Sequence, residues 1–135
     1  MSDMANSDMA NKAFRFRSVT PILRSFDEVK MREFYVDYLG FEITFEHRFG
    51  DNFPLYVGLK HGDCELHLSE HHGDSSPGVR VRIHVEALEN YWELLSRKDY
   101  RFAKPGPPEL QPWGDRELTI SDPFSNHLTF VETAP

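Results

Sequence analysis

Residues 34–41, Phe34-Tyr35-Val36-Asp37-Tyr38-Leu39-Gly40-Phe41, join the end of a predicted helix to the start of a predicted strand. Met31 extends the apolar positions of this stretch upstream at the three- and four-residue spacing of one helical face. Asp27 is placed to cap the first turn, and Gly40 is placed to end the helix. The pattern therefore predicts one amphipathic helix between residues 27 and 40.

Strand-like runs flank this helix on both sides. Before it, Ser18–Leu23 is short and partly β-branched, and Pro21 within it predicts an edge strand or a hinge, because proline has no N–H for a ladder. After it come β-branched and aromatic runs separated by turn signals, at residues 41–49, 53–60 and 63–69. The first half of the chain thus has the order β-α-β-β-β.

The second half repeats this order. Val79–Val85 alternates apolar and polar residues as a strand does, and Leu88, Tyr91, Trp92 and Leu95 mark a helical face. We then expect a short strand at Tyr100–Ala103, a proline-rich loop at 104–112, and strands at Glu117–Ser121 and His127–Glu132 around the turn Asp122–Asn126.

The chain of 135 residues has room for one domain of ordinary size. Residues 1–13 contain a repeated Ser-Asp-Met-Ala-Asn and are predicted to form a flexible tail. Residues 14–135 are predicted to form a single α+β domain with modules at about 14–72 and 78–135. Their curved mixed sheets would bury the sides that face the helices and leave concave faces as a cleft, the default ligand site.

Charge and motifs exclude several classes of function. The net charge of −7 opposes binding to nucleic acid. No apolar run of membrane-spanning length or signal peptide occurs, so we expect neither membrane insertion nor secretion, but a cytoplasmic protein. The single cysteine, Cys64, precludes an intramolecular disulfide and is expected to be structural. There is no nucleophile elbow or phosphate loop.

The phrase Phe34-Tyr35-x-x-Tyr38-Leu39-Gly40-Phe41 resembles the helix end and strand start of the vicinal oxygen chelate superfamily, which includes glyoxalase I, extradiol dioxygenases and the bleomycin resistance proteins. Pro112-Trp113-Gly114-x-Arg116-Glu117, then Asp122-Pro123 and Asn126, is similar to the bleomycin resistance branch. The resemblance covers about residues 14–134 and implies the glyoxalase/bleomycin resistance fold. One departure is Ser125, where the family usually has glycine, so the left-handed position of this turn is expected to shift or to fall on Asn126.

The resemblance also sets a test for metal binding. Enzymes of the superfamily hold a divalent metal with side chains of the first and fourth strands of each module. The first-strand positions fall here at about Ser18 and Arg80. The fourth-strand positions fall at Glu65 or His67 in the first module and at about Thr129 in the second. An arginine repels a metal ion, so we expect no metal and no cofactor. The alternative is a displaced site drawn from Glu65, His67 and His84.

Aromatic residues are the main candidates for ligand binding. Trp113 follows a proline-rich loop and has no core role in the pattern, whereas Trp92 lies on an apolar helical stripe. Phe45 and Phe49 share one strand face and Phe53 begins the next strand, although such rings also pack cores. In the bleomycin resistance proteins, the corresponding hairpin aromatics and tryptophan line a drug groove, which nominates Phe45, Phe49 and Trp113, with Phe53 as an addition. Acidic candidates to complement a cationic ligand are Asp51, Asp63, Glu65 and Asp115.

Three functions follow as hypotheses. The first is metal-independent sequestration of a planar, cationic antibiotic of the bleomycin type, by a homodimer whose N-terminal strand can be exchanged between subunits, as the resemblance implies. The second is a metal-dependent lyase or dioxygenase of the same superfamily, using the displaced ligands. The third is binding of another small metabolite or a peptide, because one fold hosts many functions.

Overall fold

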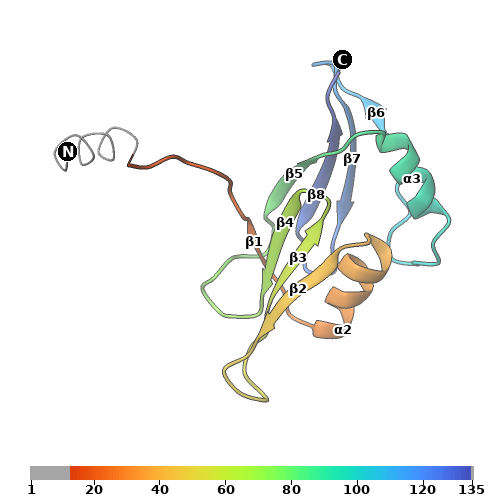
Figure 1. The fold of residues 1–135 in the computed structure, drawn as a ribbon. Coiled ribbons are helices and arrows are strands. Elements are labelled where there is room, and N and C mark those ends of the chain that lie inside the picture. Colours follow the sequence, from red (N-terminus) through yellow and green to blue (C-terminus); the bar gives the residue numbers. More distant parts are fainter. Residues whose placement is uncertain (1–12, 135) are drawn as a thin grey trace, which may run out of the picture.

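Two four-stranded mixed sheets form the body of the protein, with helices on the same side of the molecule (Figure 1). The computed structural model describes residues 13–134. The first sheet has the order β1-β4-β3-β2 and the second β5-β8-β7-β6. The strands are β1 Ile22–Arg24, β2 Glu42–His47, β3 Tyr56–His61, β4 Cys64–Ser69, β5 Arg80–His84, β6 Glu109–Leu110, β7 Arg116–Ser121 and β8 His127–Glu132. The predicted α+β class and the paired β-α-β-β-β modules are confirmed.

The first strand is short and lies at a sheet edge. β1 pairs in parallel with β4, Ile22 opposite His67, and Pro21 contributes only its carbonyl, which accepts from the backbone N–H of His67 at 2.9 Å. The prediction of a strand from Ser18 to Leu23 is too long at its start, because proline cannot donate to the ladder and the pairing begins after it. The predicted edge position is confirmed.

The first helix begins as an α-helix, α2 Glu28–Met31, and continues as a π-helix, η1 Arg32–Tyr38. The Asp27 side chain caps it by accepting from the backbone N–H of Lys30 at 2.9 Å, an interaction of about 1 kcal/mol. The backbone N–H of Leu39 reaches back to the carbonyl of Phe34, and Gly40 then takes a φ of +90°, which glycine adopts without strain. The predicted cap and stop are both present.

One predicted strand is wrong. Residues Tyr100–Ala103 form no strand, and the second strand of module two is β6, inside the segment predicted to be a loop. Tyr100 instead stacks on Tyr38, with ring centroids 4.6 Å apart. Tyr100 therefore packs against the first helix, whereas Phe102 stays 68% exposed. The second helix, α3 Leu88–Ser96, is present where its apolar stripe predicts it.

The two modules contact each other through buried polar groups. The Tyr35 hydroxyl of η1 donates to Asp122 Oδ2 in the β7–β8 turn at 2.5 Å. Asn126 Nδ2 donates to the carbonyl of Arg24 at 2.9 Å, across 102 residues of sequence. Burial and the Asp122 carboxylate together raise the pKa of Tyr35 well above its ordinary value. One hydrophobic cluster includes core residues from both modules.

The β7–β8 turn has an unusual backbone residue. Asp122 Oδ1 accepts from the backbone N–H groups of Phe124 and Asn126, both at 2.8 Å. Ser125 takes a φ of +69°, in the left-handed region. Ser125 therefore holds the left-handed position of this turn itself, and the expected shift to Asn126 does not occur.

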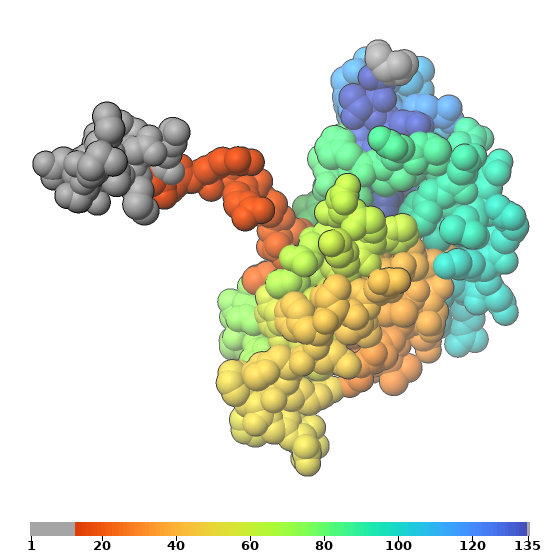
Figure 2. All heavy atoms as spheres, in the orientation of Figure 1, coloured from red at the N-terminus to blue at the C-terminus, as the bar shows by residue number. Residues whose placement is uncertain are grey.

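An extended segment, residues 13–19, precedes β1 and projects away from the two sheets (Figures 1 and 2). It exposes large apolar side chains, with Phe14 80%, Phe16 92% and Val19 89% accessible. The predicted flexible tail, residues 1–13, lies outside the described residues apart from Ala13. Within residues 13–134, every helix is too short or too polar to span a bilayer.

Candidate functional site

An aromatic cluster lies on the face of the first sheet that carries no helix. It consists of Phe45 on β2, Tyr56 on β3 and His67 on β4, three neighbouring strands. The rings of Phe45 and Tyr56 are nearly parallel with centroids 6.1 Å apart, and His67 meets both edge-on, at 5.2 and 5.3 Å. Phe45 remains 42% exposed, so this cluster offers a flat apolar surface to solvent.

A glycine makes this cluster possible. Gly58 of β3 pairs opposite Phe45, at a register shift between Ile43 and Phe45. A Cβ atom at residue 58 would lie 2.6 Å from Phe45 Cδ1, which is closer than van der Waals contact allows. The Phe45 ring therefore lies across the β3 backbone because residue 58 has no side chain.

One hydrogen bond, together with a nearby carboxylate, orients the imidazole in this cluster. The Tyr56 hydroxyl lies 2.7 Å from His67 Nδ1, and His67 Nε2 lies 3.8 Å from Glu65 Oε1. A phenol that donates to Nδ1 leaves the ring proton on Nε2, toward the carboxylate. Glu65 also accepts from the Thr20 hydroxyl at 3.2 Å. The pKa of Tyr56 is raised mainly by burial and to a smaller extent by the nearby Asp74 carboxylate, so its hydroxyl stays protonated at neutral pH.

The other predicted aromatic residues of module one lie in the β2–β3 connection. Phe49 is 72% exposed and meets His47 edge-on at 4.6 Å. Phe53 is 54% exposed, precedes the strand it was predicted to begin, and accepts through its carbonyl from Arg48. Asp51 is an exposed residue of the same turn. Phe49 and Phe53 thus add exposed aromatic side chains beyond the end of β2.

The helix-free face of the second sheet carries two hydrogen-bonded rows. In the first row, Arg80 Nη1 on β5 donates to the buried Thr129 Oγ1 on β8 at 2.9 Å. This Thr129 oxygen also lies 2.9 Å from Thr119 Oγ1 on β7. In the second, Arg82 Nη2 donates to Glu117 Oε2 at 2.8 Å, and the Trp113 indole N–H donates to the same oxygen at 3.0 Å. Trp113 is 62% exposed although its ring is held in place.

The Glu117 carboxylate has a shifted ionisation. The hydrogen bond from Arg82 is the main cause that lowers the pKa of Glu117, and the bond from Trp113 lowers it further. The same bond raises the pKa of Arg82. Near neutral pH the pair is fully ionised, so the Trp113 indole has a permanent acceptor.

The described chain does not bring the two sets of aromatic residues together. The β2–β3 connection, with Phe49 and Phe53, and the turn before β7, with Trp113, lie at opposite ends of the molecule (Figure 1). Of the acidic candidates, Glu65 lies beside the aromatic cluster. Asp115 lies near Trp113 and accepts from the backbone N–H of Ala134 at 3.4 Å.

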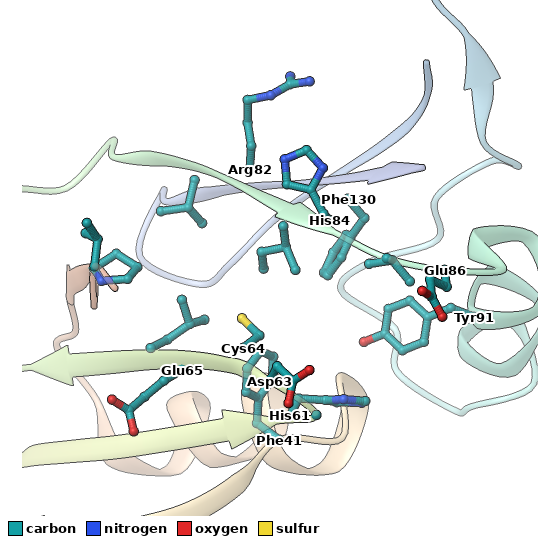
Figure 3. A pocket seen from close by; sticks show the side chains of 17 residues that line it. Phe41, His61, Asp63, Cys64, Glu65, Arg82, His84, Glu86, Tyr91 and Phe130 are labelled. Atoms are coloured by element: carbon teal, nitrogen blue, oxygen red, sulfur yellow. The ribbon is translucent and has the colours of Figure 1, made fainter. Parts of the chain in front are cut away.

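A cavity of about 630 Å³ lies between the two modules (Figure 3). The β3–β4 hairpin, with His61, Asp63 and Glu65, forms one wall, and Arg82 and His84 of β5 lie on the opposite side. Tyr91, Phe41 and Phe130 complete its apolar part, and burial raises the pKa of Tyr91 well above its ordinary value.

Cys64 lines the same cavity as a free thiol. Burial raises its pKa, which disfavours the reactive thiolate.

The expected metal-ligand positions do not form a metal site. Thr20, rather than the expected Ser18, lies beside Glu65, and Arg80 contacts Thr129 in module two. A guanidinium and two hydroxyls do not suit a divalent metal. His84 lies 3.5 Å from the Thr133 hydroxyl. Across residues 13–134, no three His, Cys, Asp or Glu side chains are grouped closely enough to hold a metal ion, and this includes the displaced set.

Sequence reasoning missed Tyr56 and Gly58. The signal for Gly58 was present, since a glycine inside an otherwise apolar strand marks a close approach by a side chain or a ligand. Tyr56 lies within the strand predicted at residues 53–60, but no sequence pattern marks it as a binding residue. The prediction that Trp92 is a packing residue agrees with its place against the core, where its indole N–H donates to the carbonyl of Pro105 at 2.9 Å.

Comparison with known proteins assigns the family. The family model described as glyoxalase superfamily protein matches residues 5–135, and the chain belongs to this superfamily. No curated protein matches the chain.

Several solved structures share the fold. A bleomycin-binding protein crystallised with bleomycin is 22% identical, with 87% of this chain and 99% of that chain covered and a TM-score of 0.64. TnmS3, an antibiotic-binding protein from Streptomyces sp. CB03234, is 21% identical, with 90% and 99% covered and a TM-score of 0.70. A glyoxalase/bleomycin resistance/dioxygenase superfamily member from Sphaerobacter thermophilus DSM 20745 is 24% identical, with 87% and 98% covered and a TM-score of 0.65. These similarities confirm the glyoxalase/bleomycin resistance fold.

Proposed function

We propose that this protein binds a planar aromatic small molecule, an antibiotic of the bleomycin type, without a metal and without altering it chemically. The observation that carries this proposal is the pair of exposed but fixed aromatic surfaces. Phe45 is held by Gly58, Tyr56 and His67, and Trp113 is held by Glu117. Rings that are ordered before binding lose little entropy when a flat ligand stacks on them.

The charges of the first face suit a cationic ligand. Glu65 adjoins the aromatic cluster at the edge of the module cavity, and Asp51 lies in the turn that carries Phe49 and Phe53. Each exposed charge pair adds only about 0.5–1 kcal/mol, so affinity rests mainly on stacking and apolar burial. Two of the structural neighbours are described as binding bleomycin or an antibiotic, which agrees with a ligand of this kind.

A homodimer completes the proposed site. Phe49 and Trp113 lie at opposite ends of one chain, so they can line one groove only if they come from different copies. The exposed Phe14 and Phe16 of the extended segment also favour a partner that covers them, such as an exchanged N-terminal strand. Equilibrium sedimentation tests this assembly: we expect twice the 15.8 kDa of one chain, and a monomer at micromolar protein would contradict it.

Tryptophan fluorescence tests the binding proposal. Metal-free and copper-bound bleomycin are titrated into the full chain and into Trp92→Phe, in which Trp113 is the remaining fluorophore. Saturable binding at micromolar ligand, lost in Phe45→Ala and in Trp113→Ala, is expected. Leu110→Ala, which removes another exposed apolar side chain, is the matched control and should bind normally.

Two outcomes separate the alternatives. No binding of either form at about 0.1 mM would withdraw bleomycin as the ligand. Stoichiometric zinc, nickel or iron that survives dialysis and is lost in Glu65→Gln would favour the metal-dependent enzyme. Glu65 is the residue to change because its carboxylate lies 3.8 Å from His67 Nε2, so the two side chains could share a metal ion.

A further inference from the structure

The two hydrogen-bonded rows on the second sheet differ in charge. Arg82 forms an ion pair with Glu117, so that row is neutral. The other arginine ion pairs among residues 13–134 belong to Arg32, Arg48 and Arg116, and Arg80 is not among them. Within residues 13–134, the Arg80 guanidinium has one hydrogen bond to a protein group, the neutral Thr129 hydroxyl. Arg80 is exposed and has no ion-pair partner among residues 13–134, although it lies close enough to Glu117 to help lower the pKa of that carboxyl.

The hydroxyl groups beside Arg80 leave a second donor free. Thr129 is only 2% exposed and accepts from Arg80, so its own proton is best satisfied by the oxygen of Thr119, 2.9 Å away. Thr119 then accepts this bond, and because it is exposed, its proton is available to a ligand. The buried Thr129 hydroxyl thus contacts both Arg80 and Thr119, and it holds the remaining N–H donors of Arg80 near the hydroxyl of Thr119.

We propose that Arg80 and Thr119 form a subsite for the carboxylate of the aromatic ligand. A guanidinium presents a planar fork of donors that matches two carboxylate oxygens, and a neighbouring hydroxyl adds a third bond. This inference rests on the proposed function, and it narrows the ligand to a planar aromatic zwitterion, whose carboxylate would meet Arg80 while its cationic group meets the acidic side chains of the first sheet.

The neighbouring row explains why the acid should be aromatic. Arg82 follows Arg80 by two residues on β5, a separation of roughly 7 Å, and connects through Glu117 to the exposed Trp113 ring. A ligand with its carboxylate on Arg80 therefore has an aromatic surface within reach on the same face. A bare anion gains little at a distance from a protein of net charge −7, so the ring must supply binding energy.

A matched pair of probes tests this subsite. The acid 2-naphthoate, ionised at pH 7, and the neutral 2-naphthamide have the same ring system and differ in the group that would meet Arg80. We expect the full chain to bind the acid about tenfold more tightly than the amide. Arg80→Met should reduce this preference to within about twofold while binding of the amide is unchanged, and Thr119→Val should weaken only the acid. Arg101→Met, an exposed arginine that lies over Phe102, is the control and should preserve the preference.

A second readout separates this inference from the proposed function. Acetate and acetamide are titrated while the Nε–Hε signal of Arg80 is followed by NMR, which requires no aromatic binding. A shift with acetate alone, without binding of either naphthyl probe, would support the subsite and contradict the aromatic function. Absence of the acetate shift, equal affinity for the two naphthyl probes, or a preference that survives Arg80→Met would overturn the subsite.

Discussion

Gly58 lies directly beneath the Phe45 ring, so that a Cβ atom at residue 58 would stand 2.6 Å from Phe45 Cδ1 and 2.7 Å from Thr44 Oγ1. The position of the Phe45 ring thus depends on the absence of a side chain in the next strand. A core glycine here controls a surface that we propose to be functional.

Gly58→Ala is expected to displace Phe45 and to lower the free energy of unfolding by about 1–3 kcal/mol, because the added methyl group overlaps the ring. Urea unfolding measures the stability, and bleomycin titration should show weaker binding at a temperature where the variant is folded. Gly106→Ala is the control, since a Cβ there has no neighbour within 4 Å and should change neither quantity. Normal binding by a folded Gly58→Ala variant would contradict the role of the Phe45 ring.

Trp113→Phe separates the ring from its hydrogen bond. The phenyl ring retains a stacking surface but has no N–H for Glu117, so we expect a loss of affinity of about threefold, against about tenfold or more for Trp113→Ala. Fluorescence of Trp92 or calorimetry measures both. Equal losses in the two variants would mean that the hydrogen bond, rather than the ring surface, determines binding.

The Trp113 emission should report the ionisation of Glu117. Because Arg82 lowers the pKa of this carboxyl, the emission of the Trp92→Phe variant should change with a midpoint below 4.5, the usual value for glutamate. The stabilisation from the pair is present above that usual value and lost as the pH falls through the lower folded-state pKa. Arg82→Gln should move the midpoint upward, and a midpoint unaffected by this substitution would contradict the assignment. Circular dichroism is the control that the protein remains folded.

Ser125→Gly should stabilise the protein by about 0.5–1 kcal/mol. Ser125 has a φ of +69°, a conformation that costs a residue with a Cβ more than it costs glycine. Thermal unfolding should show a higher Tm. Ser76→Gly, an exposed serine outside the left-handed region, should be neutral or slightly destabilising, and the same gain in both variants would disprove the backbone explanation.

Tyr35→Phe is expected to destabilise the fold by about 1–3 kcal/mol, because a buried carboxylate loses a donor while the ring is kept. Asp122 would retain the donors of the β7–β8 turn. Tyr100→Phe removes a hydroxyl for which residues 13–134 show no hydrogen bond, and its stability should stay within about 0.5 kcal/mol of the native value. A Tyr35→Phe variant as stable as this control would show that the bond contributes nothing.

Local patterns predicted most of the fold. The apolar period around Met31 and Phe34, the Asp27 cap and the Gly40 stop are properties of short segments, and the structure has all of them. The prediction of a strand at Tyr100–Ala103 was wrong. The Tyr100 ring stacks on Tyr38 instead, and this contact depends on the tertiary structure rather than on local strand propensity.

The candidate site was less predictable. Phe45 and Trp113 could be nominated from resemblance and spacing, but Tyr56 joins Phe45 only through the β2–β3 register and its bulge. The rows from Arg80 to Thr119 and from Arg82 to Trp113 cross three strands, so no sequence window contains them. Register decides which side chains meet, and it is fixed by the assembled sheet.

The loop between β4 and β5 connects the modules along the outside of the molecule (Figure 1), and residues 76–78 within it are exposed. The contacts from Tyr35 to Asp122, from Asn126 to Arg24 and from Tyr91 to Leu39 hold the modules together without help from this loop. A cut at Pro77 would leave each of them intact. We therefore expect the two halves to reassemble when they are co-expressed as two polypeptides, and this reassembly would report on the proximity of proteins fused to them.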